Sequence, residues 1–154
     1  PEEEYFRIID HVIQKGDYHD QDPGKIRQAA EILKTRLVTL SDLNQKLGLF
    51  FEENPEIKDL QAIEVLKEEN SKTVLKEFLQ QAENLDQLTS ENLGQLVKLV
   101  QKTTGIKGRG LWMPLRCAIT REVSGPELPA MLDFFGGEKC LHLIRQTLEN
   151  PSLN

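Results

Sequence analysis

The sequence is organised around residues 104–132, which read TGIKGRGLWMPLRCAITREVSGPELPAML. Glycine occupies positions 105, 108 and 110, and because glycine is costly inside a helix, we expect a loop there. An apolar run resumes over 111–119, where Pro114 fits a first helical turn that does not need its missing N–H. Residues 124–127, SGPE, match a capping box with proline near the start of the next helix.

The same region concentrates positive charge. Between positions 92 and 121 there is no acid, and the six bases are Lys98, Lys102, Lys107, Arg109, Arg116 and Arg121. The other residues carry 13 bases and 25 acids, a local sum of −12. A single cationic patch on an anionic body is typical of a protein that binds a polyanion at one place. The net charge of −6 argues against non-specific binding of nucleic acid by the whole surface.

Working outward, apolar residues recur with helical spacing along the chain, and no segment alternates with period two. Helices are predicted over 1–15, 25–37, 41–48, 57–66, 74–82, 90–100, 111–119, 128–135 and 138–149. The fold class is therefore predicted to be all-α, built from two packed helical subdomains. The polar run 67–72 marks the expected seam, which gives subdomains 1–70 and 71–154.

Several kinds of protein are disfavoured by what the sequence lacks. No apolar run approaches the roughly 18 residues that a membrane span needs, and no N-terminal segment reads as a signal peptide. Two cysteines, at positions 117 and 140, form neither a disulfide framework nor a zinc pattern, so a reducing cytoplasm is expected. Cys140 and His142 are too few ligands for zinc, and no metal site or catalytic residue is predicted. The chain begins with Pro1 rather than methionine, as a piece cut from a longer protein would.

The basic region offers chemistry suited to RNA. Arginine presents a planar donor fork that matches phosphates and base edges and can stack on an exposed base. Gly125 and Pro126 leave the main chain open to close approach by a nucleotide. The apolar neighbours of Trp112 favour a core position for it over base stacking. The alternative for the whole patch is that its charges only solvate one surface.

These residues carry a resemblance to a known family. Gly-x-Gly-Leu-Trp-Met-Pro-Leu-Arg-x-Ala-Ile-Thr at 108–120, followed by Gly-Pro-Glu-Leu-Pro-x-Met-Leu at 125–132, resembles the C-terminal end of bacterial-type glutamyl-tRNA synthetase. Residues 32–43, ILKTRLVTLSDL, resemble that family's first anticodon-domain segment. The resemblance implies an all-helical region that reads the anticodon of tRNA(Glu). Neither class I signature motif of the catalytic domain is present, which implies a non-catalytic part of a ligase.

The resemblance also implies site residues. Arg116 corresponds to an anticodon-contacting arginine, Gly125, Pro126 and Leu128 to the base pocket, and Arg36 to a side chain that senses the third anticodon base. Lys107 and Arg109 are expected to steer the RNA backbone. Arg121 stands where the family often has glycine, and it is left outside the pocket.

The partners implied are tRNA(Glu) and, in cis, the catalytic domain of the parent ligase, whose cofactors would be ATP and magnesium. No cofactor is expected in this chain itself, which we expect to be a monomer without membrane contact. Two alternatives stay open: a helical scaffold that docks an acidic protein, and a general RNA-binding module without anticodon preference. The scaffold predicts no competition by tRNA, and the general module predicts equal affinity for any tRNA.

Overall fold

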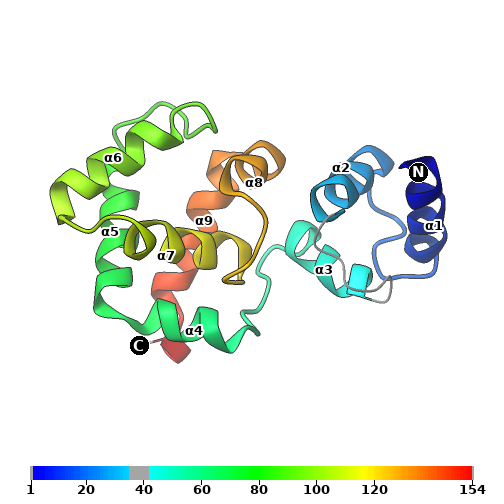
Figure 1. Cartoon of the computed structure of the whole chain (residues 1–154), viewed down its shortest axis with the longest axis horizontal. Helices are drawn as coiled ribbons and strands as arrows, with labels where there is room; N and C mark the ends of the chain where they lie inside the picture. Colours follow the sequence, from blue (N-terminus) through cyan, green and yellow to red (C-terminus); the bar gives the residue numbers. More distant parts are fainter. Residues whose placement is uncertain (1, 35–41, 154) are drawn as a thin grey trace. The chain divides into compact units, whose positions relative to one another are not determined.

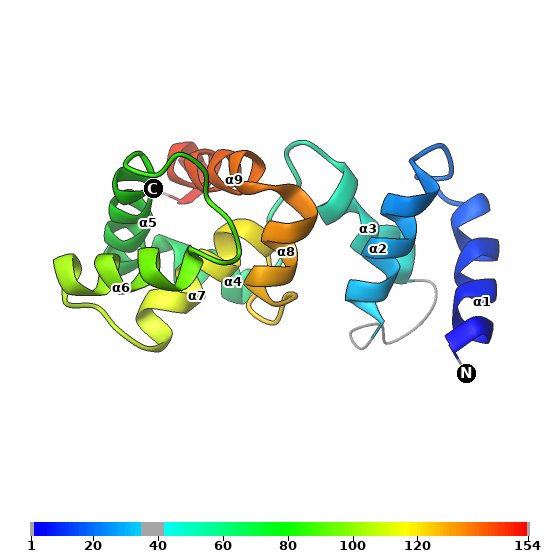
Figure 2. The same ribbon diagram turned by 90° about the horizontal axis from the view of Figure 1, so that it is seen from above.

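The computed structural model describes residues 2–34 and 42–153 of the chain. Within these ranges the backbone forms nine α-helices and a 3-10 turn, η1 (Pro151–Leu153), with no strand (Figures 1 and 2). The predicted all-α class is confirmed. The chain divides into two compact units, Pro1–Pro55 and Glu56–Asn154.

The first unit contains α1 (Glu2–Gln14), α2 (Pro23–Leu33) and α3 (Asp42–Phe51). The helices bury one apolar face each, with the larger core side chains being Phe6, Ile9, Ile13, Ile26, Leu33, Leu43, Leu47 and Phe50. The Tyr5 hydroxyl donates to the Ala30 carbonyl at 2.9 Å, which ties α1 to α2. The Tyr18 hydroxyl donates to Glu52 Oε1 at 2.8 Å and fixes the α1–α2 loop against the end of α3.

Two boundaries in this unit differ from the sequence prediction. The helix expected from Lys25 begins at Pro23, because the Asp22 carboxylate accepts from the Lys25 N–H at 3.0 Å and caps it. Gly48, expected to end the third helix, lies inside α3. A Cβ at Gly48 would come 3.2 Å from the Tyr18 hydroxyl oxygen, so this glycine admits a close neighbour and does not end the helix.

The second unit contains α4 (Leu60–Lys67), α5 (Glu69–Ala82), α6 (Leu93–Thr104), α7 (Arg109–Thr120), α8 (Leu128–Phe135) and α9 (Gly137–Glu149). Helix α7 lies at its centre and contacts α4, α5, α8 and α9 (Figure 1). The last four residues of α7, Cys117–Thr120, are all buried. A helix segment that is buried on every side belongs inside a core, and this one packs against the surrounding helices.

The two compact units meet at Pro55 and Glu56, whereas the sequence placed the seam near residue 70. The polar run 67–72 contains the last residue of α4, Glu68 between the helices, and the first turn of α5. Both α4 and α5 pack on α7, so this run lies within the second unit. Residues 67–70 are exposed at the surface, whereas Ser71 is buried.

Candidate nucleic-acid interface

The glycine-rich loop joins α6 to α7. Helix α6 ends at Gly105, whose φ of 75° is left-handed and whose N–H donates to the Gln101 carbonyl at 2.8 Å. The next left-handed residue, Gly108 with φ 66°, precedes the first turn of α7. The predicted break in helical structure is confirmed over 105–108, whereas Gly110, also expected in the loop, lies inside α7. The break turns the chain so that the end of α6 and the start of α7 present their basic residues together.

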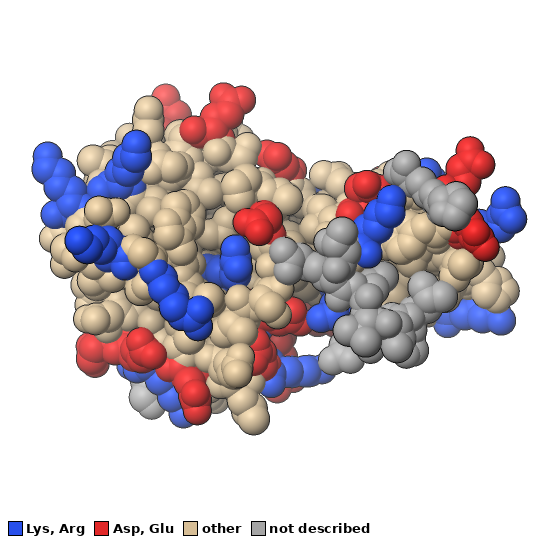
Figure 3. All heavy atoms as spheres, viewed as in Figure 1, with Lys and Arg blue, Asp and Glu red and all other residues tan. Residues whose placement is uncertain are grey.

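We call the exposed lysines and arginine Lys98, Lys102, Lys107 and Arg109, together with the half-buried Arg116, the cationic surface. Figure 3 shows basic side chains gathered over α6 and α7. Lys98 and Lys102 are four residues apart on α6 and so share one face of it. Because positions 92–121 contain no acid, acidic side chains of these two helices do not dilute this charge.

Arg121 does not belong to the cationic surface, because its side chain is buried. Its Nη1 donates to the Ala118 carbonyl and to the Thr147 hydroxyl oxygen, both at 2.7 Å. Burial lowers the pKa of Arg121 to about 10, so the guanidinium remains charged at neutral pH. Its φ of 65° ends α7 in the left-handed conformation. Arg121, at a position where the family often has glycine, therefore joins the end of α7 to α9.

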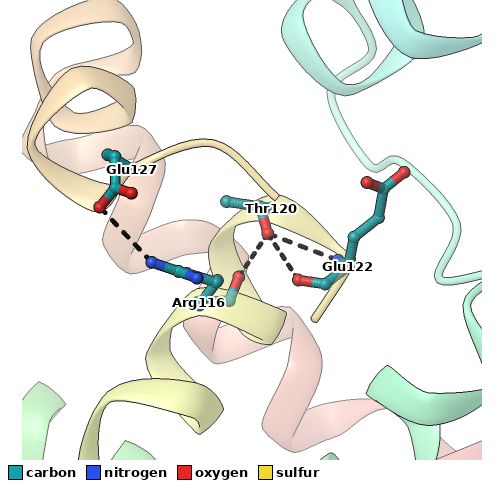
Figure 4. Close-up of polar contacts among 4 residues, drawn as sticks. All are labelled: Arg116, Thr120, Glu122 and Glu127. Carbon is teal, nitrogen blue, oxygen red and sulfur yellow. Dashed lines mark hydrogen bonds and ion pairs between the residues drawn. The ribbon is translucent and has the colours of Figure 1, made fainter. Parts of the chain in front are cut away.

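Arg116 reaches solvent beside the loop between α7 and α8 (Figure 4). Its side chain is 29% exposed, and its Nη2 lies 3.5 Å from Oε2 of Glu127, which is 70% exposed. An ion pair this open contributes on the order of 0–1 kcal/mol to stability. The guanidinium can therefore exchange Glu127 for another anion at little cost.

Thr120 shapes the loop that follows Arg116. Its hydroxyl oxygen lies 2.8 Å from the Arg116 carbonyl and 3.0 Å from the Glu122 carbonyl (Figure 4). A Cβ on Gly125 would overlap the same oxygen, so only glycine fits there. The absence of a side chain at position 125, expected to admit a nucleotide, is thus already required by Thr120.

Gly125, Pro126 and Leu128 are all buried. Helix α8 begins at Leu128, with the extended Glu127 as its N-cap and Pro129 in its first turn. The predicted capping box at 124–127 is therefore wrong, because Gly125 and Pro126 are used in the loop and the helix starts one residue after the box ends. Among the described residues predicted for anticodon contact, Arg116 is the one whose side chain reaches solvent.

Asp59 also holds this loop, and no sequence pattern singled it out. Its Oδ1 accepts from the Gln61 N–H and caps α4, while its Oδ2 accepts from the Val123 N–H, both at 3.0 Å. An aspartate before a helix predicts the first contact. The second joins residues 64 positions apart, and no local pattern announces it.

Three other predictions for single residues have different outcomes. Arg36 lies outside the described residues. Trp112 was expected in the core, but its side chain is 42% exposed, so this prediction is wrong. Pro114 lies inside α7 and not in its first turn, because the helix begins at Arg109. Helix α7 thus begins two residues before the predicted start at 111, and within its first turn Leu111 is buried while Trp112 is exposed.

The chain is similar in sequence to known proteins over most of its length. The family model described as anticodon binding domain matches residues 4–148. The chain belongs to the anticodon binding domain family. A glutamate–tRNA ligase of Latilactobacillus sakei subsp. sakei (strain 23K) is 41% identical over 113 residues, which is 73% of this chain and 21% of the relative. That of Geobacillus stearothermophilus is 31% identical over 145 residues, 92% of this chain and 29% of the relative.

Solved structures support the fold of this anticodon binding domain. The crystal structure of a glutamate tRNA ligase from Elizabethkingia meningosepticum CCUG26117 in complex with its amino acid has a TM-score of 0.71 and 20% identity. The match covers 96% of this chain and 29% of that one. The chain thus spans less than a third of the length of the relatives it matches.

None of the helices in residues 2–34 and 42–153 is long and apolar enough to cross a membrane. The same residues contain no group of three or more histidine, cysteine, aspartate or glutamate side chains placed to hold a metal ion.

Proposed function

We propose that this anticodon binding domain reads the anticodon of tRNA(Glu) as one part of a glutamate–tRNA ligase. The observation that carries the proposal is the cationic surface, which presents Arg116 at solvent on a chain of net charge −6. An anionic protein repels RNA except where its lysine and arginine side chains gather, so tRNA is attracted to the cationic surface. Its relatives are glutamate–tRNA ligases, which supports tRNA(Glu) as the tRNA that it binds.

In this proposal Arg116 is the side chain that contacts the anticodon. Its guanidinium gives up Glu127 and donates to base edges or to a phosphate oxygen. The hydrogen bonds of Thr120 and Asp59 hold the adjoining loop, so that Gly125, Pro126 and Leu128 shape the wall beside the base. Lys107 and Arg109 attract the RNA backbone, and Arg36 senses the third anticodon base.

The wider setting belongs to the same proposal. The ligase would join glutamate to tRNA(Glu) using ATP and magnesium bound by its catalytic domain, which this chain would serve in cis. We place it in the cytoplasm, as a monomer. This chain supplies anticodon contacts and no catalytic group.

The test is binding of the chain to a tRNA(Glu) transcript and to a twin altered only at the third anticodon position. Tighter binding of the normal anticodon supports the proposal, equal binding indicates a general RNA-binding module, and no binding indicates the scaffold alternative. Arg116→Ala should weaken cognate binding by about 1–3 kcal/mol and reduce discrimination between anticodons.

Two matched variants refine that test. Arg145→Ala removes an exposed arginine of α9, outside the cationic surface, and should leave binding unchanged. Glu127→Gln keeps the shape of the side chain but removes the anion beside Arg116, and should tighten binding. Unchanged cognate binding in Arg116→Ala would show that this arginine has been given the wrong role.

A further inference from the structure

The first turns of α7 carry an aromatic ring between two arginines. Arg109, Trp112 and Arg116 are spaced three and four residues apart, so they fall on one face of the helix. Arg109 is exposed, and Trp112 and the Arg116 side chain are 42% and 29% exposed. At a rise of 1.5 Å per residue, the three side chains span about 10 Å of helix axis.

Exposure of this indole is not explained by packing. Residues Leu111, Pro114 and Leu115 of the same helix are buried, so the apolar side of α7 is already complete without Trp112. Leu99, also exposed at 47%, lies between Lys98 and Lys102 on α6. Exposed apolar side chains thus occur on both helices of the cationic surface. Apolar area rimmed by charge marks a binding site more often than a bare surface.

We propose that Trp112 is a stacking platform for an unpaired base of bound RNA, with Arg109 contacting phosphate beside it. The inference deepens the proposed function, on which it rests. Every base has a flat π-face that can lie on an indole ring, and the arginines on either side neutralise the phosphates that accompany the base. A peptide of acidic residues alone would satisfy the charges but would offer no ring to cover the indole.

Trp112 supplies its own probe, because it is the single tryptophan of the chain. An anticodon stem-loop RNA is titrated into the chain while tryptophan emission is followed, and the anisotropy of labelled RNA is measured in parallel. Stacking predicts saturable quenching with the same Kd as the anisotropy. Binding seen by anisotropy without any change in emission overturns the stacking proposal and leaves the proposed function standing. Absence of binding by both methods overturns both.

Substitutions give an independent readout. Trp112→Ala should weaken binding about 5- to 100-fold, the loss expected for one base stack, and Trp112→Phe should recover part of it. Leu60→Ala removes another exposed apolar side chain, on α4, and should change nothing. Arg109→Ala should weaken binding of all RNAs alike, while Arg145→Ala should not.

Two results would contradict the platform. One is equal affinity of the Trp112→Ala, Trp112→Phe and parent chains, with helical circular dichroism showing that all are folded. The other is quenching by polyglutamate, with no quenching by the RNA, which would assign the surface to an acidic protein.

Discussion

At the scale of single residues, Arg116 and Arg121 show how position decides the role of a charge. Both were counted in one basic patch, yet Arg116 reaches solvent and Arg121 is buried. A non-glycine residue in the left-handed conformation costs about 1–2 kcal/mol. The hydrogen bonds from Arg121 to Ala118 and Thr147 offset that cost, since bonds from a charged donor are among the stronger ones.

Replacing Arg121 should therefore affect stability. Arg121→Met keeps a long side chain but removes both hydrogen bonds and leaves the Ala118 carbonyl without this donor. We expect the free energy of unfolding to fall by about 2–4 kcal/mol, measured by urea denaturation. Arg145→Met, at an exposed position, should change it by less than about 0.5 kcal/mol. Equal stability of the two variants would show that the buried contacts have little weight.

The two cysteines make a prediction about pH. Burial raises the pKa of Cys117 and of Cys140 to about 12, with Asp59 adding to the rise at Cys117. The folded chain thus holds the thiol protons through a pH range where the unfolded chain, with an ordinary pKa near 9, releases them. The free energy of unfolding should therefore fall as pH rises from about 9 to 12. At pH 8.5, iodoacetamide should modify the two cysteines only after denaturation, and mass spectrometry follows the labelling. Rapid labelling of the folded chain would contradict this.

At the scale of elements, helical periodicity predicted the fold class and the bounds of α8, but not where α7 begins. The rule works where one face of a helix is buried, as in α1 and α2. It fails for α7, whose first turns bury Leu111 and Pro114 but expose Trp112. The apolar neighbours of Trp112 predict a core position for it, but which side chains of a helix are covered is set by contacts remote in sequence.

The loop between α7 and α8 can be tested through its glycine. A Cβ at Gly125 would overlap Thr120, so Gly125→Ala should destabilise the chain by about 1–3 kcal/mol and weaken RNA binding with it. Gly94→Ala is the matched control, since a Cβ there meets nothing within 4 Å in α6. It should stabilise the chain by up to about 1 kcal/mol. Thermal and urea unfolding measure both, and a neutral Gly125→Ala would mean that the loop yields without cost.

At the scale of the whole molecule, the sequence predicted two helical parts but placed their boundary near residue 70. The polar run 67–72 carries the signal of a linker, yet the division falls at Pro55 and Glu56. Composition identifies exposed segments, and an exposed turn between packed helices has the composition of a linker. Because α4 and α5 both pack on α7, the run 67–72 lies within one unit and does not link two. That packing depends on contacts between residues remote in sequence, which no local pattern contains.

Net charge leads to the last prediction, which concerns salt. The chain is acidic as a whole, so only the cations that touch RNA should release counterions on binding. The cationic surface has five members, Lys98, Lys102, Lys107, Arg109 and Arg116, and for single-stranded RNA each phosphate contact contributes about −0.7 to the slope of log affinity against log salt.

A slope no steeper than about −4 is therefore expected, measured with an anticodon stem-loop between about 50 and 200 mM salt. Lys102→Ala should make it shallower by about 0.7, whereas Lys76→Ala, at an exposed position on α5, should leave it unchanged. A much steeper slope would mean that lysine or arginine side chains outside the cationic surface also contact the RNA. Acidic side chains cannot account for a steeper slope, because they displace no cations from the phosphates.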